Sequence, residues 1–69
     1  MNMKTVDARG LSCPTPVVLT MQALEVAQDF KVLVDNPVAL ERITRMLKDK
    51  HNIVPSIENE GDDIIIHVQ

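Results

Sequence analysis

The chain has 69 residues, a hydrophobic content of 45% and a formal net charge of −3 at pH 7. A chain of this length has a core too small to enclose a large cofactor. We therefore expect a single domain over residues 1–69 that holds neither a metal nor an organic cofactor. The acidic balance and the lack of Tyr and Trp argue against direct binding of nucleic acid.

Cysteine usage and hydropathy predict the compartment. Cys13 is the only cysteine, which excludes an internal disulfide and a zinc site built from cysteines alone. No run approaches the roughly 20 apolar residues that span a bilayer, and the N-terminus lacks the apolar core of a signal peptide. We expect a reducing, cytoplasmic location and no membrane-embedded segment.

Strand and helix periodicities alternate along the chain. Apolar residues at every second position indicate strands, and apolar stripes at intervals of three and four indicate helices. Asn36 and Pro37 supply a favoured N-cap and first residue for the second helix. The strands are expected at residues 4–8, 30–35, 53–58 and 63–68, the helices at residues 14–27 and 37–49, and the last turn at residues 59–62.

This order predicts an α/β two-layer sandwich with the arrangement β-α-β-α-β-β. Right-handed crossovers place both helices on one face of a four-stranded mixed sheet with strand order 1-2-4-3, the last strand antiparallel to the others. Pro55 cannot donate to a strand ladder, so the third strand belongs at an edge. The opposite face of the sheet stays open, and its residues are expected to include Lys31, Leu33, Ile65 and His67.

Charged residues gather in two segments. Four cations fall in the second helix and four carboxylates in the final hairpin, which suggests two solvated surfaces or, alternatively, a patch for docking a protein. These residues are Arg42, Arg45, Lys48 and Lys50 in the helix, and Glu58, Glu60, Asp62 and Asp63 in the hairpin.

Cys13 lies at the junction between a loop and the first helix, a poor place to bury a side chain. If the helix begins at Cys13 or Pro14, the thiol occupies the N-cap and faces the positive end of the helix dipole, which lowers the thiol pKa. Pro14 and Pro16 then fall in the first turn, where their missing N–H groups cost no helical hydrogen bond. The donors left to face the sulfur are chiefly those of Thr15 and Val17.

Several roles for this cysteine lack the residues they need. Dithiol exchange requires a second cysteine, and nucleophilic catalysis requires a paired base, whereas His51 and His67 stand at a turn and near the chain end. No ligand spacing supports a metal site. A lone cysteine is often an inert core residue, but an exposed, activated thiol can carry a persulfide sulfur, a selenium atom or a mixed disulfide.

The first two strands are expected to be parallel neighbours, so the turns that follow them should meet at one edge of the sheet. Ligand sites in open α/β sheets favour this edge. Arg9 could offer positive charge to a thiolate or perthiolate, and Asp35 and Asn36 could shape the rim of the site. A solvated arginine and ordinary helix capping explain the same residues equally well.

The string V-D-A-R-G-L-S-C-P-T-P-V, followed by a helix, a strand, D-N-P, a helix and two strands, resembles the sulfur-carrier family typified by TusA and SirA. The signature of that family is Cys-Pro-x-Pro at the start of the first helix. The resemblance implies a persulfide-bearing cysteine and a sulfurtransferase-like carrier without metal or organic cofactor. By position, Cys13 carries the sulfur, Pro14 and Pro16 are the motif prolines, and Asp7, Gly10 and Leu11 form the leading half of the motif.

The resemblance also implies partners: a sulfur donor, such as a cysteine desulfurase or a rhodanese-like protein, and an acceptor protein. Residues 35–39 look most similar to YedF-type members associated with selenium metabolism, and residues 26–29 replace a Pro-Gly turn of the tRNA-thiolation member. Other members work beside thiosulfate transporters, so contact with a transporter stays open. The alternatives are a selenium carrier and a regulatory interaction domain in which Cys13 is dispensable.

Overall fold

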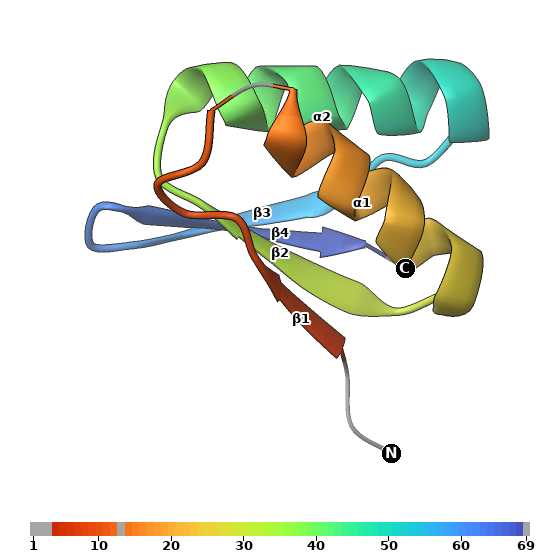
Figure 1. The fold of residues 1–69 in the computed structure, drawn as a ribbon, viewed down its shortest axis with the longest axis horizontal. Coiled ribbons are helices and arrows are strands. Elements are labelled where there is room, and N and C mark those ends of the chain that lie inside the picture. Colours follow the sequence, from red (N-terminus) through yellow and green to blue (C-terminus); the bar gives the residue numbers. More distant parts are fainter. Residues whose placement is uncertain (1–3, 13, 69) are drawn as a thin grey trace.

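The structure, a computed structural model, describes residues 4–12 and 14–68. Residues 1–3, Cys13 and Gln69 lie outside the described residues. The elements follow the order β-α-β-α-β-β (Figure 1), as the sequence predicts. They are β1 (Lys4–Asp7), α1 (Thr15–Val26), β2 (Phe30–Val34), α2 (Pro37–His51), β3 (Ser56–Glu60) and β4 (Asp63–Val68).

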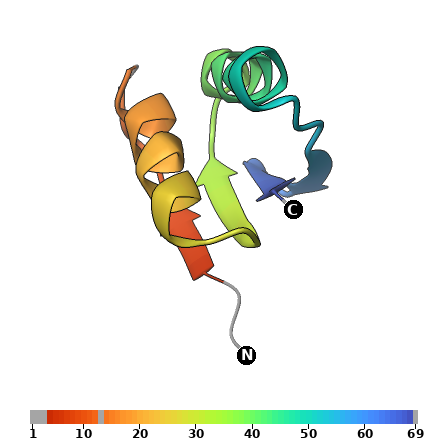
Figure 2. The same cartoon turned by 90° about the vertical axis from the view of Figure 1, so that its right-hand side faces the viewer.

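The four strands form one sheet in the order β1-β2-β4-β3. β1 and β2 are parallel, and β4 runs antiparallel to both of its neighbours, β2 and β3. Both helices lie on the same side of the sheet, with α1 packed over β1 and β2 and α2 beside α1 (Figure 2). The expected two-layer α/β sandwich and its strand order are therefore confirmed.

The core fills the space between the helices and the inner face of the sheet. Alternate residues of β2 and β4 point into it, so Phe30, Val32 and Val34 are fully buried while the residues between them are half-buried. Thr20 is the buried polar residue of α1, and its hydroxyl donates to the Pro16 carbonyl at 2.9 Å. The other buried apolar residues are Val6, Ala8, Ala23, Ala39, Ile43, Met46, Leu47, Ile66 and Val68.

The uncovered face carries the four residues that alternation placed there. Lys31 pairs with His67 and Leu33 with Ile65 across β2 and β4, and all four are half-buried. They alternate with the core residues along each strand, because successive side chains of a strand point to opposite faces.

The final hairpin differs from its expected boundaries. β3 begins at Ser56 rather than at residue 53, because the Ile53 N–H donates to the Leu47 carbonyl and Pro55 has no N–H to donate. The turn contracts to Gly61 and Asp62, since Glu60 still pairs with Asp63. Gly61 has a φ of 62°, and two-residue hairpin turns require such a positive φ at their first central residue.

α2 extends two residues further than its expected end. Its start is capped by the Asn36 side chain, which accepts from the Ala39 N–H at 2.8 Å. Its end is closed by Asn52, which adopts a left-handed φ of 56° and donates its N–H to the last turn. Neither helix, over the ranges 4–12 and 14–68, is long and apolar enough to cross a membrane.

Candidate functional site

The site is defined by the residues on either side of Cys13, which itself lies outside the described residues. α1 begins at Thr15, later than expected, and Pro14 occupies the N-cap position with φ −96° and ψ 13°. Pro16 falls at the second helical position, where proline is tolerated. The cysteine therefore precedes the N-cap by one residue instead of occupying it.

The start of α1 also uses one of the two amides expected to face the sulfur. The Thr15 N–H donates to the Ser12 carbonyl at 2.9 Å, which joins the loop to the helix. The first helical bond runs from the Val18 N–H to the Pro14 carbonyl at 3.0 Å. The Thr15 amide, one of the two amides expected to face the sulfur, is therefore occupied by the Ser12 carbonyl.

Arg9 is engaged by two carboxylates in the loop that leads to Cys13. Its Nε and Nη2 donate to the two carboxylate oxygens of Asp7 at 2.9 and 2.8 Å, and its Nη1 donates to Asp63 Oδ2 at 2.9 Å. The bidentate bond to Arg9 lowers the pKa of Asp7 to about 2. The two carboxylates raise the pKa of Arg9 above its ordinary value, and Asp7 has a larger effect than Asp63.

Through these contacts, Arg9 links the end of β1 and the loop before Cys13 to the start of β4. Its charge is already opposed by Asp7 and Asp63, so little of it remains to attract a thiolate. Asp63 follows Arg9 by 54 positions, and no spacing rule in the sequence connects them. Asp63 is therefore a residue of the site that the sequence did not reveal, because its position indicates only membership of the acidic hairpin.

Asp35 links the same loop to the end of β2. Its Oδ2 accepts from the Gly10 N–H at 2.9 Å, and Gly10 has a φ of 74°, which only glycine adopts without strain. The turns after β1 and β2 thus meet at one edge of the sheet, as their parallel pairing predicts. Asn36, next to Asp35, caps α2 instead of facing the loop, and Leu11 is partly exposed beside this edge.

The two histidines lie away from the junction. His67 is on the uncovered face of the sheet, with its Nε2 3.6 Å from Glu58 Oε1. His51 ends α2, at the opposite end of that helix from Val38, which shares a groove with Pro14. Within residues 4–12 and 14–68, no three His, Cys, Asp or Glu side chains gather closely enough to hold a metal ion.

A groove runs between α1 and α2 and begins beside Cys13 in the sequence. Pro14, Val17 and Met21 line it from α1 and its N-cap, and Arg42 and Met46 from α2. Its volume is about 570 Å³, and it is open to solvent. Sequence periodicity placed these residues on the two helices, but only the packing of α1 against α2 brings them together.

Protonation of Asp7 at low pH is expected to break its bidentate contact with Arg9. The carboxyl pKa of Asp7 is about 2 in the folded chain against an ordinary value of 3.8, so ionised Asp7 stabilises the fold. This contribution is complete above the ordinary pKa and is lost as the pH falls through about 2. The difference in free energy of unfolding between wild type and Asp7→Asn should therefore shrink over that interval.

Urea unfolding at a series of pH values measures this difference. The matched control is Asp29→Asn, which changes an exposed carboxylate without a bond to any described residue. The difference in free energy of unfolding between Asp29→Asn and wild type should not show the same dependence on pH. A constant difference for Asp7→Asn down to pH 2 would contradict the bidentate contact with Arg9.

Comparison with known proteins identifies the family of the chain and a solved structure with a similar fold. The family model described as "Sulfurtransferase TusA" matches residues 4–69. A SirA-like protein from Desulfitobacterium hafniense has a similar solved structure, with a TM-score of 0.83 and 27% identity, covering 96% of this chain and 95% of that one.

Two curated relatives share the name "Putative sulfur carrier protein". The protein from Aquifex aeolicus is 35% identical over 69 residues, which cover 96% of this chain and 35% of that protein. The protein from Thermotoga maritima is 38% identical over 61 residues, covering 84% of this chain and 77% of that protein. The chain thus spans about a third of the Aquifex relative and about three-quarters of the Thermotoga one. Its fold and its match over residues 4–69 show that the chain belongs to the sulfurtransferase TusA family.

Proposed function

We propose that the chain carries sulfur as a persulfide on Cys13 and relays it from a donor enzyme to an acceptor protein. The single observation that carries this proposal is the family match over residues 4–69, which includes the only cysteine of the chain. The donor would be a cysteine desulfurase or a rhodanese-like protein. The setting would be the cytoplasm, where a reducing environment keeps a lone thiol free.

The transfer requires no base or metal from this chain. The Cys13 thiolate attacks the outer sulfur of a donor persulfide, a new S–S bond forms, and the donor S–S bond breaks to release the donor cysteine as a thiolate. The proton lost from Cys13 goes to solvent, and the donor thiolate takes one up. An acceptor thiolate then attacks the outer sulfur on Cys13 in the same way, so no net oxidation occurs.

The loop before the cysteine supports this role by its anchoring. The contacts Arg9–Asp63 and Gly10–Asp35 hold its first residues against β4 and the end of β2. A carrier must offer its sulfur to two different proteins, and an anchored loop does so at a low cost in conformational entropy. Asp7 positions Arg9, while Leu11, Pro14 and Pro16 complete the proposed motif around Cys13.

Sulfur, rather than selenium, is the proposed cargo. The residues resembling selenium-associated members have structural roles, because Asp35 binds the Gly10 N–H and the Asn36 side chain caps α2. These contacts explain the Asp-Asn-Pro string without a second cargo. A regulatory domain acting through the uncovered sheet face is the alternative from another class, and its activity would not depend on Cys13.

Loading with a sulfur donor tests the proposal. Purified protein incubated with polysulfide should gain the mass of one sulfur atom, and dithiothreitol should remove it. Cys13→Ala should gain nothing under the same conditions. Parallel loading with polyselenide, which carries selenium at the same oxidation level as the sulfur of polysulfide, compares the two cargoes. Preferential uptake of selenium would favour the selenium carrier.

The carrier proposal fails if the wild type acquires no labile sulfur or if Cys13→Ala acquires it equally. Retention of the protein's cellular activity in Cys13→Ser, together with its loss in Leu33→Glu, would favour the regulatory alternative. Leu33 is half-buried on the uncovered face, so circular dichroism must first show that the Leu33→Glu variant is folded.

A further inference from the structure

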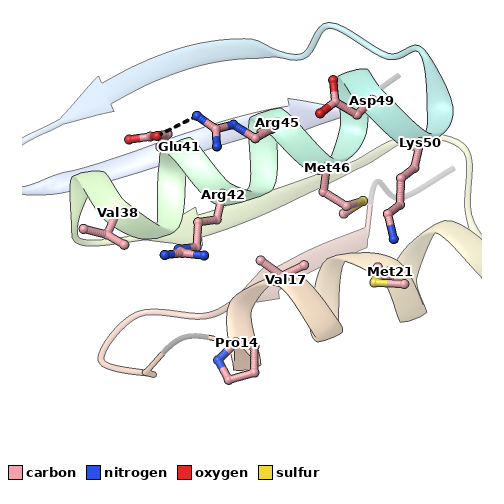
Figure 3. Close-up of a pocket in the computed structure, with 10 residues that line it drawn as sticks. All are labelled: Pro14, Val17, Met21, Val38, Glu41, Arg42, Arg45, Met46, Asp49 and Lys50. Carbon is pink, nitrogen blue, oxygen red and sulfur yellow. Dashed lines mark hydrogen bonds and ion pairs between the residues drawn. The ribbon is translucent and has the colours of Figure 1, made fainter.

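The groove between α1 and α2 has an apolar floor that no described segment covers. Val17 and Met46 face each other across it, and Met21 lies further along α1 (Figure 3). Met21 and Val38, at opposite ends of the groove, are 41% and 55% exposed. Large apolar side chains that gather in an open groove are more typical of an interaction surface than of a solvated one.

Two cations flank this floor, and neither is paired with a carboxylate among the described residues. The side chains of Arg42 and Lys50 extend from α2 toward α1, whereas Arg45 turns to Glu41 and bonds its Oε1 at 3.0 Å (Figure 3). Asp49 points away from the floor. Neither Arg42 nor Lys50 forms an ion pair with any other described residue.

The spacing of the two cations limits what they can bind together. They are eight residues apart on one helix, which corresponds to about 12 Å along its axis. A single small anion cannot reach both, and it would leave the apolar floor bare. An extended polypeptide rises about 3.3 Å per residue, so carboxylates four residues apart span about 13 Å with an apolar side chain between them.

The groove also lies at the proposed sulfur-carrying residue. Pro14 lines one end of it, and the Cα atoms of consecutive residues are about 3.8 Å apart, so Cys13 adjoins that end by chain connectivity alone. A polypeptide bound along the groove would be held beside the cysteine.

We propose that this groove docks an acidic, extended segment of the sulfur-transfer partner. An apolar side chain of that segment lies on Val17 and Met46, and carboxylates on either side of it bind Arg42 and Lys50. The assignment rests on the proposed sulfur-carrier function, which supplies the reason for a partner at this end of α1. The basic second helix is then a binding surface and not merely a solvated one.

A synthetic peptide of the sequence Glu-Ala-Leu-Ala-Glu, blocked at both ends, tests the groove directly. Titrated into ¹⁵N-labelled protein, it should cause saturable chemical-shift changes at residues that line the groove. The variant Arg42→Glu/Lys50→Glu should bind the peptide about tenfold more weakly. It loses both ion pairs with the peptide carboxylates, which are exposed pairs of ordinary strength, and replaces them with like charges. The peptide Lys-Ala-Leu-Ala-Lys should cause no such changes, and Glu-Ala-Ser-Ala-Glu should bind more weakly than the leucine peptide.

Lys48→Glu is the matched control. Like each half of the double variant, it reverses one positive charge on the same helix, but Lys48 lines a different hollow with Ile53 and Val54. The affinity should therefore stay within about twofold of wild type. Absence of saturable shifts, equal weakening by Lys48→Glu, or shifts centred on the uncovered face would overturn the proposal. Self-association of the chain that competes with the peptide would also overturn it, because the occupant would then be a second copy.

The docking surface and the carrier function can be disproved independently of each other. Peptide binding needs no sulfur, and loading of Cys13 by polysulfide needs no groove. The Arg42→Glu/Lys50→Glu variant should therefore load from polysulfide as the wild type does. If peptide binding is absent while polysulfide still loads Cys13, the docking surface is wrong and the carrier function stands.

Discussion

Replacing Phe30 with alanine is expected to unfold a large fraction of the molecules. Phe30 is fully buried on β2, and it is the only aromatic residue of the chain. Truncation of a buried phenylalanine costs about 3 to 5 kcal/mol, since the lost contacts leave a cavity that small neighbours cannot refill. Natural domains retain about 0.05 to 0.15 kcal/mol of stability per residue, so a chain of this length has few kcal/mol to lose.

Urea unfolding followed by circular dichroism measures this loss. Phe30→Leu serves as a milder variant that should stay folded and lose roughly 1 kcal/mol, because it nearly conserves volume. Val54→Ala is the control, since Val54 is 80% exposed and its truncation should change stability by less than about 0.5 kcal/mol. A Phe30→Ala variant as stable as Val54→Ala would show that the core is not organised around β2.

The second large effect is expected at Gly10. Its φ of 74° lies in the left-handed region, which is strained for residues with a Cβ and most strained for β-branched ones. Gly10→Val should cost about 1 to 2 kcal/mol. A Cβ at this position would meet no atom within 4 Å, so the cost comes from the backbone conformation and not from a clash.

Gly61→Val provides a control with nearly the same strain. Gly61 has a φ of 62° and equally open surroundings, but it lies in the turn between β3 and β4. Both variants should lose similar stability in urea. Only Gly10→Val disturbs the hydrogen bond to Asp35 and the loop that leads to Cys13.

The difference between the two variants should appear in sulfur transfer. A misplacement of about 1 Å at a reacting group can slow a reaction on the order of 100-fold. Gly10→Val should therefore slow the passage of sulfur from Cys13 to an acceptor thiol at least tenfold by this reasoning. Gly61→Val should leave the rate unchanged, and equal rates for the two variants would show that the loop does not position the cysteine.

The site differs from an activated catalytic centre in how its charges are used. Arg9 is bound to Asp7 and Asp63, and the Thr15 amide is bound to the Ser12 carbonyl. The charges and donors near the junction therefore anchor the loop more than they stabilise an anion. This arrangement suits the proposed carrier role, in which the partners would supply the chemistry.

The sequence by itself determined the elements and their order. Strand alternation around Val32 and the Asn36 cap of α2 are local signals, and the rule of right-handed crossovers then leaves few topologies. The α/β sandwich, the strand order and the meeting of the turns after β1 and β2 followed from these signals. The start of β3 did not follow from them, because Ile53, expected in this strand, instead donates its N–H to the Leu47 carbonyl near the end of α2.

The tertiary structure alone decided how the charged residues are used. Arg9 and Asp63 are 54 positions apart, and the antiparallel pairing of β4 with β2 brings the start of β4 to the edge where β1 ends. Arg42 and Lys50 acquire a shared apolar floor only when α1 packs against α2. Periodicity assigns a side chain to a face of its own element, but its partner comes from the packing of elements distant in sequence.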